Sequence, residues 1–472
     1  LLQFDDYDIK SLSIECLKSF CQTNRDQMTQ KQNGNEMSLL EQILANFKSL
    51  YSSLSESSLI CLFELTAALI RHVNSDEVRH QIFVITIQYL NEPLSQITPL
   101  RQIDQNTCHS LSLLAQCNAA LASSLQNYVQ YFLTKFETFI NAYNTLTQGI
   151  VAATQQPNLT HQQMIEIDAM KNACNSIINL VERTISYNNN PQITRENFFP
   201  VCMTVILDGF ASTPPIAKTP KVLKLFDTFM VKLRQEFSEH SGLILSKLFN
   251  PVAEMLMQNY NAYSSIAHDF FNFMLRFTQT CTEVILGMSP EEINIFIETI
   301  KFGMSLADES ISKLSHSILC ELFCQIKLKL GGDPDSLNGF VATFAVPLFI
   351  FTFQIMTDKM HKTAFLEQTA IITQILKLDN ISAVATPMFD QLSQLFPEQP
   401  PQMISEFLQN LITNVNDKRK MNELLKDFMI NVKQLLPQDP DLLAMEREES
   451  RKRTEEIFKQ ITPDFQKQND FL

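Results

Sequence analysis

One stretch of the chain places three potential metal ligands at helical spacing. His316, Cys320 and Cys324 stand four residues apart, so a helix would carry their side chains on one face. Imidazole and thiolate groups are good ligands for zinc. Apolar residues interleave with this stripe, namely Ile318, Leu319, Leu322 and Phe323. A buried helix explains both patterns, so we predict structural cysteines in a core and no metal site.

Sequence signatures of enzymes are missing. The chain contains no GxGxxG, GxxxxGK[ST], HExxH or GxSxG motif, and its nine glycines leave little material for a phosphate-binding loop. Acidic pairs such as Glu291-Glu292 stand where helices begin, and there negative charge is favoured by the helix dipole. We predict no catalytic residue and no cofactor, and we do not expect an enzyme.

Composition indicates an all-α protein that binds other proteins. Among 472 residues, 45% are hydrophobic and 19% charged, which is normal for a folded chain. Nine glycines are too few for a β-rich or α/β chain of this length. The net charge of −14 disfavours direct binding to nucleic acid, because an acidic surface repels phosphate. Ten scattered cysteines without a CxxC pair indicate a reducing compartment.

Apolar residues recur at the spacing of amphipathic helices. One stripe predicts a helix from Met37 to Leu54, and others follow from Leu59 and from Ile293. Ser289-Pro290-Glu291-Glu292 is a strong signal for a helix start. Helix pairs recur every ~40–50 residues from Leu243 onward, which is the spacing of HEAT repeats. The predicted fold is therefore a HEAT-repeat α-α superhelix, a solenoid of antiparallel helix hairpins.

Three further features refine this organisation. The helices at Leu125–Gln155 and Thr160–Tyr187 are predicted to be longer than average. Proline and polar clusters predict breaks between helices, one of them at Pro93–Asp104. The apolar run Phe340–Met356 has 17 residues and contains Pro347, which is short of a membrane span, so a buried helix is expected.

The chain is divided into three predicted parts. Residues 1–36 form an incomplete leading repeat and a polar loop, 37–440 form the repeat array, and 441–472 form a charged helix and tail. Two interpretations of residues 441–472 are open: a solvated helix stabilised by ion pairs, or an arm that packs across the concave surface of the array. The residues assigned to such an arm are Leu442, Leu443, Glu446, Arg447, Glu448, Arg451, Lys452 and Arg453.

The order of several motifs resembles the C-terminal part of the exportin-1 family, nuclear export receptors of the importin-beta or karyopherin superfamily. The match is collinear over nearly the whole chain, and the stretch 422–449 is its most specific part. The motifs that carry it are Glu196-Asn197-Phe198-Phe199-Pro200, Pro220-Lys221-Val222-Leu223, Met356-Thr357-Asp358, Leu424-Leu425-Lys426-Asp427-Phe428, Asp441-Leu442-Leu443 and Glu446-Arg447-Glu448.

The resemblance implies a receptor that shuttles between nucleus and cytoplasm. Its partners would be Ran GTPase in the GTP form, cargo proteins with leucine-rich export signals, and nucleoporins, without direct nucleic acid binding or membrane insertion. The family's cargo groove, with its reactive cysteine, and the N-terminal Ran-binding repeats are expected to precede Leu1, so the chain is expected to be a C-terminal fragment. The family's acidic tail is only weakly matched by Thr462–Leu472.

Two other functions fit the same architecture. An import receptor of the importin or transportin type would bind Ran and release cargo on doing so. A HEAT scaffold subunit of an enzyme assembly, such as a phosphatase, would not distinguish the nucleotide states of Ran.

Overall fold

The computed structural model describes residues 7–23, 38–100, 103–123, 125, 128–155, 159–331, 333–358, 364–378 and 381–433. Every element within these ranges is helical, which confirms the all-α prediction. The chain divides into two compact units, unit 1 (Leu1–Met255) and unit 2 (Leu256–Leu472). The predicted part boundaries at residues 36 and 440 lie outside the described residues and stay predictions.

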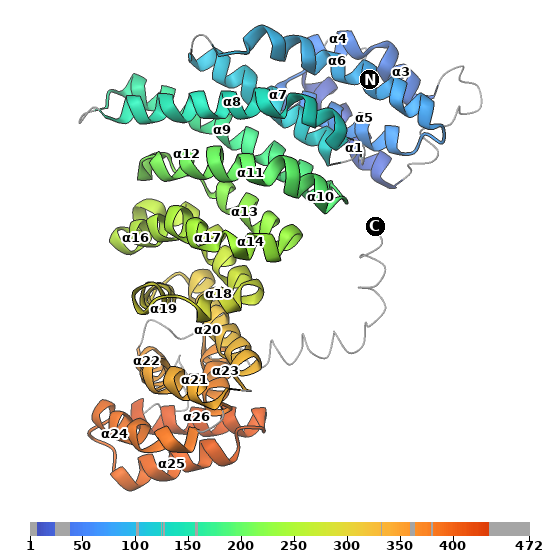
Figure 1. Ribbon diagram of the computed structural model, residues 1–472. Helices are drawn as coiled ribbons and strands as arrows, with labels where there is room; N and C mark the ends of the chain where they lie inside the picture. Colours follow the sequence, from blue (N-terminus) through green and yellow to red (C-terminus); the bar gives the residue numbers. More distant parts are fainter. Residues whose placement is uncertain are drawn as a thin grey trace. The chain divides into compact units, whose positions relative to one another are not determined.

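The longest helices of unit 1 cover residues 128–154 and 161–187, and shorter, linked helices follow them (Figure 1). Its helices are α1 (Tyr7–Thr23), α3 (Leu39–Ala45), α4 (Phe47–Ser53), α5 (Glu56–Arg71), α6 (Asp76–Ile97), α7 (Gln105–Ala122), α8 (Tyr128–Thr154), α9 (His161–Tyr187), α10 (Pro191–Ile193), α11 (Phe199–Val201), α12 (Leu207–Ser212), α13 (Pro220–Leu233), α14 (Gln235–Glu239) and α15 (Ser241–Ile244). A 3₁₀ turn at Pro215–Ala217 precedes α13.

Unit 2 continues with helix pairs of more even length. The boundary between the units falls within α16 (Asn250–Gln258). The helices that follow are α17 (Tyr260–Thr280), α18 (Thr282–Leu286), α19 (Pro290–Met304), α20 (Glu309–Leu330), α21 (Pro334–Phe340), α22 (Val346–Thr357), α23 (Phe365–Leu376), α24 (Ala385–Leu395), α25 (Pro401–Thr413) and α26 (Lys418–Lys433). A 3₁₀ turn at Ile381–Val384 precedes α24.

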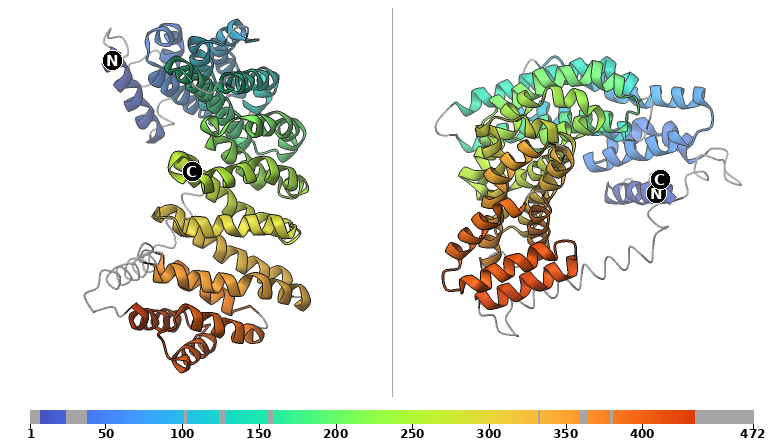
Figure 2. Two further views of the ribbon diagram at one scale, coloured as in Figure 1. Left: turned by 90° about the vertical axis from the view of Figure 1, so that its left-hand side faces the viewer. Right: turned by 60° about the horizontal axis from the view of Figure 1, so that its bottom comes forward.

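Within each unit the hairpins stack through one series of helices, here called the stacking helices. In unit 1 the series is α1, α5, α7, α9 and α13, each packed on the next. In unit 2 it is α17, α20, α23 and α26. Each hairpin also packs its two helices together, as α8 does with α9 and α19 with α20 (Figures 1 and 2). Stacked antiparallel hairpins of this kind are the predicted HEAT-type arrangement.

A stacking helix must be apolar on more than one side, and α9 shows how the sequence achieves this. Ile177, Ile178, Leu180 and Val181 are all completely buried, although they point in different directions around the helix axis. The helix as a whole packs against α7, α8 and α13, and it also contacts the 3₁₀ turn at Pro215–Ala217. Burying one such side chain contributes about 1.5–3 kcal/mol. Burial of such side chains, within and between hairpins, therefore contributes strongly to stability.

Side-chain caps begin several helices where the sequence indicates. The Ser289 hydroxyl accepts a hydrogen bond from the Glu292 amide at 3.2 Å, and the Glu292 carboxylate accepts one from the Ser289 amide at 2.9 Å. Thr160 and Gln163 form the same reciprocal pair at the start of α9. These capping boxes satisfy amides that have no partner within the helix. They confirm the predicted starts of α19 and α9.

Two predicted boundaries are wrong. The helix predicted from Met37 to Leu54 is two helices, α3 and α4, which meet at Asn46. The backbone of Asn46 leaves the helical region there, with φ −103° and ψ 5°. The break predicted to begin at Pro93 is also absent, because α6 continues through Pro93 to Ile97. A proline removes only one helical hydrogen bond, and packing of the flanking Leu90 and Leu94, both at most 3% exposed, compensates for this loss.

π-helical turns precede prolines in the described helices. Turns at Thr194–Phe198, Leu245–Phe249 and Val341–Ala345 each end two residues before a proline. A proline ring clashes with the carbonyl group four residues earlier, and a wider turn relieves this clash. Each helix therefore continues through its proline. A fourth π turn, Cys202–Ile206, follows Pro200 and leads into α12.

The apolar run at Phe340–Met356 belongs to a longer helix than its sequence suggests. The helix extends over Asp335–Thr357 and, alone in the described part of the chain, is long and apolar enough to cross a membrane by length and composition. Most of its apolar stretch is buried within the protein, as predicted; Phe349 and Phe353 are fully buried.

Packing at Gly303 generates a prediction for stability. A Cβ atom there would lie 2.6 Å from the buried Phe271 ring of α17 and closer still to the Ser315 hydroxyl of α20. We expect Gly303→Ala to lower the free energy of unfolding by about 1–3 kcal/mol, because the core has no room for the methyl group. Urea unfolding followed by circular dichroism measures this.

A matched control is available in α21. Gly339 has open space around its Cβ position, so Gly339→Ala is expected to be neutral or to raise stability by up to about 1 kcal/mol. Equal unfolding midpoints for the two variants would contradict the packing argument.

Candidate partner-binding cleft

Unit 1 contains a cleft of about 780 Å³ where several helices end or begin. The end of α5, the start of α6, the α7–α8 connection and the end of α9 form its walls. We call it the helix-end cleft. Its lining residues are Ile70, Arg71, Asp76, Arg79, His80, Phe83, Leu125, Tyr128, Ser186, Tyr187 and Asn189. A volume of this size is in the range that accommodates a small molecule or a short stretch of peptide.

Aromatic side chains form the floor of the helix-end cleft. The Phe83 ring packs edge-on against Tyr128 and Tyr131, with centroid distances of 6.4 and 5.7 Å. The Tyr128 hydroxyl donates to Asn118 Oδ1 at 2.7 Å, and the Tyr131 hydroxyl donates to Asn91 Oδ1 at 2.5 Å. Burial raises the pKa of both phenols, so the hydroxyls stay protonated and keep these bonds. The floor is therefore rigid.

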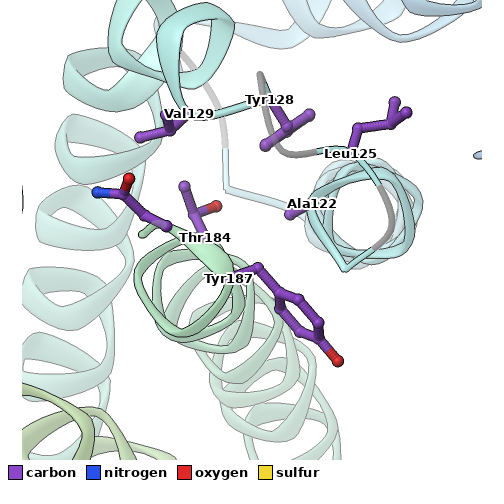
Figure 3. Close-up of a pocket in the computed structure, with 7 residues that line it drawn as sticks. Ala122, Leu125, Tyr128, Val129, Thr184 and Tyr187 are labelled. Carbon is purple, nitrogen blue, oxygen red and sulfur yellow. The ribbon is translucent and has the colours of Figure 1, made fainter. Parts of the chain in front are cut away.

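A second, smaller pocket lies between the α7–α8 connection and α9, and it shares Leu125, Tyr128 and Tyr187 with the helix-end cleft. Figure 3 shows Ala122, Leu125, Tyr128 and Val129 on one side and Thr184 with Tyr187 from α9 on the other. Tyr187 extends outward from the end of α9, and 51% of its surface is exposed. An exposed tyrosine beside an apolar recess is a typical contact residue in protein interfaces.

The lining carries more positive than negative charge. Arg71, Arg79 and His80 face one acidic residue, Asp76, which forms an ion pair with Arg79. With His80 neutral, two positive charges and one negative charge leave a surplus of one. The whole chain has a net charge of −14, so the cleft is distinct from the protein's average surface. Arginines also bind carboxylates through paired hydrogen bonds.

Polar contacts hold the end of α9 in place. The Lys232 ammonium of α13 donates to the carbonyl oxygen of Asn188 at 3.0 Å, where α9 ends. The buried Glu182 carboxylate accepts hydrogen bonds from Ser186 at 2.8 Å and from Thr228 of α13 at 3.0 Å. A cation at a helix C-terminus is favoured by the helix dipole. The neighbouring hairpin thus positions the wall that carries Tyr187.

The size and lining of the helix-end cleft are suited to binding. Among the lining residues no carboxylate, thiol or hydroxyl is hydrogen-bonded to a histidine in the manner of an activated nucleophile. Over the ranges that the structure describes, no three His, Cys, Asp or Glu side chains come together as metal ligands. The residues assigned to a C-terminal arm, 442–453, lie outside the described residues.

The sequence stripe at His316, Cys320 and Cys324 is only partly buried. His316 is fully buried and its Nδ1 lies 2.7 Å from the carbonyl oxygen of Ser312, but both cysteines are half-exposed. The prediction that they are buried core cysteines is wrong. The stripe rotates away from the core along α20, because helical positions four residues apart drift around the axis.

Lys218 is a buried cation, and no carboxylate among the described residues forms an ion pair with it. Only 8% of the residue is exposed, and its ammonium donates to the Phe210 carbonyl while lying 4.3 Å from the centre of the Phe210 ring. Burial lowers the pKa of Lys218 to about 8. The bond ties the segment before α13 to the end of α12, a helix C-terminus that favours positive charge.

The fold is that of an all-α helical-repeat array of the importin type. A solved structure described as "Importin13 cytosolic state" aligns with a TM-score of 0.55 over 90% of this chain and 45% of that chain, at 11% identity. At this identity the likeness is one of fold alone.

The family model described as CRM1 C terminal matches residues 131–436, and the chain belongs to this family. It is 22% identical over 372 residues to "Protein EXPORTIN 1B" of Arabidopsis thaliana, which covers 72% of this chain and 34% of that protein. It is 22% identical over 376 residues to "Exportin-1" of Schizosaccharomyces pombe, and this alignment covers 73% of this chain and 34% of that protein. It is 18% identical over 433 residues to "Exportin-1" of Drosophila melanogaster, and this alignment covers 87% of this chain and 40% of that protein. The chain thus spans about a third to two fifths of the length of these relatives, and the predicted resemblance to the C-terminal part of exportin-1 is confirmed.

Sequence reasoning missed the helix-end cleft. Its lining residues come from segments near 70–83, 125–128 and 186–189, and no spacing rule links them. The one local signal is Tyr187, which ends the apolar pattern of α9 just before the polar run Asn188–Asn190.

The buried lysine generates a prediction for pH dependence. The folded protein releases the Lys218 proton near pH 8, whereas an unfolded chain holds a lysine proton to about pH 10.4. Between these values the unfolded state binds more protons, so stability rises with pH by up to about 3 kcal/mol. We expect the melting temperature to increase relative to that of Lys218→Met between pH 8 and pH 10. If the melting temperatures of the two proteins changed in parallel between pH 8 and pH 10, the lowered pKa of Lys218 would be contradicted.

Proposed function

We propose that this chain is the C-terminal part of a nuclear export receptor, which shuttles between nucleus and cytoplasm and has no catalytic activity of its own. The receptor binds Ran in its GTP form together with cargo that carries a leucine-rich export signal, and it contacts nucleoporins during passage. The observation that carries the proposal is the family match over residues 131–436, joined to collinear similarity with exportin-1 proteins.

The architecture supplies a physical route for coupling Ran to cargo. Neighbouring hairpins move slightly against each other at every interface, and these small movements sum along a long stack to a change of its curvature. Two ligands that favour the same curvature bind cooperatively, since each shifts the population toward the form that the other prefers. Coupling of about 1–3 kcal/mol corresponds to roughly a 5- to 150-fold change in affinity. The segment 442–472 is proposed to oppose that form when it packs across the concave surface.

A binding experiment on the full-length receptor tests this proposal. Fluorescence anisotropy of a labelled leucine-rich export-signal peptide is recorded without Ran, with Ran-GDP and with Ran-GTP. We expect Ran-GTP alone to tighten binding at least fivefold, and deletion of 442–472 to tighten binding without Ran. Weaker peptide binding with Ran-GTP would indicate an import receptor, and equal binding with both nucleotides would indicate a scaffold.

We further propose that the helix-end cleft receives an acidic segment of a protein partner that also carries an apolar side chain. The surplus of positive charge supports the acidic character, and the aromatic floor with the exposed Tyr187 supports the apolar contact. Basic segments are disfavoured by Arg71 and Arg79.

Charge reversal in the cleft tests this second proposal. A fluorescein-labelled peptide that alternates Glu with Phe is titrated against the protein, and a Lys–Phe peptide serves as comparison. We expect Arg71→Glu to weaken binding of the Glu–Phe peptide about tenfold at low salt, through a loss of about 1.4 kcal/mol. Arg419→Glu on α26, at an exposed arginine in unit 2, is the matched control and should bind normally. Equal binding of both peptides would overturn the acidic assignment.

A further inference from the structure

Lys218 is the one buried lysine or arginine in the part of the chain that the structure describes. An ammonium group has three N–H donors. Among the described residues one hydrogen-bond acceptor meets it, the Phe210 carbonyl oxygen, and the Phe210 ring adds a cation–π contact at 4.3 Å from the ring centre. At least one N–H group of Lys218 is therefore open to a further acceptor.

A small cavity lies beside Lys218, between α8, α9 and the segment that joins α12 to α13. Its volume of about 10 Å³ is near the lower limit for one water-sized particle. Lys171 of α9 also lines it, and the Lys171 ammonium donates to the Ile216 carbonyl oxygen at 3.3 Å. None of the described lining residues is acidic. The cavity thus offers room for one small ligand beside two cations.

The hydroxyl groups that line the cavity differ in how firmly they are held. The three threonine hydroxyls each donate to a carbonyl or amide oxygen of the protein. The hydroxyl of the buried Tyr143 donates to the Ile206 carbonyl oxygen at 3.4 Å, which is long for an O–H···O bond. An anion in the cavity would accept a stronger bond from this hydroxyl, because charged acceptors form shorter and stronger hydrogen bonds. Lys218 and Tyr143 are thus the two buried donors that it would meet.

We infer that this cavity binds one chloride ion as the counter-ion of Lys218. The inference goes beyond the proposed transport function and does not depend on it. A buried charge is costly unless an opposite charge and hydrogen bonds compensate it, and a water molecule supplies only a dipole. The N-terminus of α13, which Thr219 caps beside the cavity, adds partial positive charge. The small volume favours a monoatomic anion over phosphate or a carboxylate.

The ion would connect three segments of unit 1. Tyr143 belongs to α8, Lys171 to α9, and Lys218 to the segment between α12 and α13. α8 and α9 form one hairpin, and α13 is the stacking helix that packs next on α9. A bound anion therefore stabilises the junction between successive hairpins. It also favours the protonated amine, so the pH dependence expected of Lys218 is that of the protein in chloride-free buffer.

Thermal unfolding in two salts tests the inference. The 472-residue protein is melted at about pH 7 in sodium chloride and in sodium gluconate of equal ionic strength, so that screening is the same. We expect wild type to melt at least about 2 °C higher in chloride, the shift that a ligand at roughly ten times its dissociation constant produces. Lys218→Met should lose this difference. Lys221→Met, which removes a cation outside the cavity lining, is the matched control and should keep it. Equal effects of chloride on wild type and Lys218→Met would overturn the inference.

A second measurement needs no variant and locates the ion directly. Crystals of the wild-type protein grown in sodium chloride are measured by long-wavelength anomalous diffraction, which reveals chloride and sulfur but not water. The sulfur of Cys174 lines the same cavity and calibrates the signal. We expect a separate anomalous peak within hydrogen-bond distance of Lys218 Nζ. A water molecule without anomalous signal at that place, or chloride found only on the protein surface, would contradict the assignment.

Discussion

The hairpins in the described part of the chain bury their apolar surfaces against one another, and the rest of the structure depends on this constraint. α9 and α20 each have neighbours on several sides, so their sequences are apolar around much of their circumference. Helix pairs therefore have to stack, and stacking leaves one edge of each stacking helix for solvent or partners. The half-exposed thiols of α20 and the exposed Tyr187 of α9 both lie at such edges.

Polar contacts between successive hairpins act at helix ends. Lys232 of α13 donates a hydrogen bond to the Asn188 carbonyl oxygen at the end of α9. Lys327 of α20 donates one to the carbonyl oxygen of Lys377 at the end of α23. In both cases a lysine on one stacking helix satisfies a carbonyl group that has no partner within its own helix. Such bonds fix the register between hairpins while the apolar contacts supply most of the free energy. A stack built in this way keeps its neighbours aligned and still allows small displacements at each interface.

The stacked hairpins and the match to the CRM1 C-terminal family are the observations on which the proposed binding function rests. The proposed export function places the coupling between Ran and cargo in the stack itself. The helix-end cleft belongs to unit 1, and helix ends together with the α7–α8 connection form it.

The sequence by itself determined the helical class and the hairpin spacing, because apolar periodicity and capping residues act locally. The Ser289 cap and the buried stripe at Ile293, Phe296 and Ile300 are examples. Local rules were wrong at Pro93 and Asn46, where packing or a local turn outweighed propensity. Only the tertiary structure decided the helix-end cleft and the exposure of Cys320 and Cys324. Both depend on which helix edges meet across the stack, and no residue spacing along one chain segment encodes that.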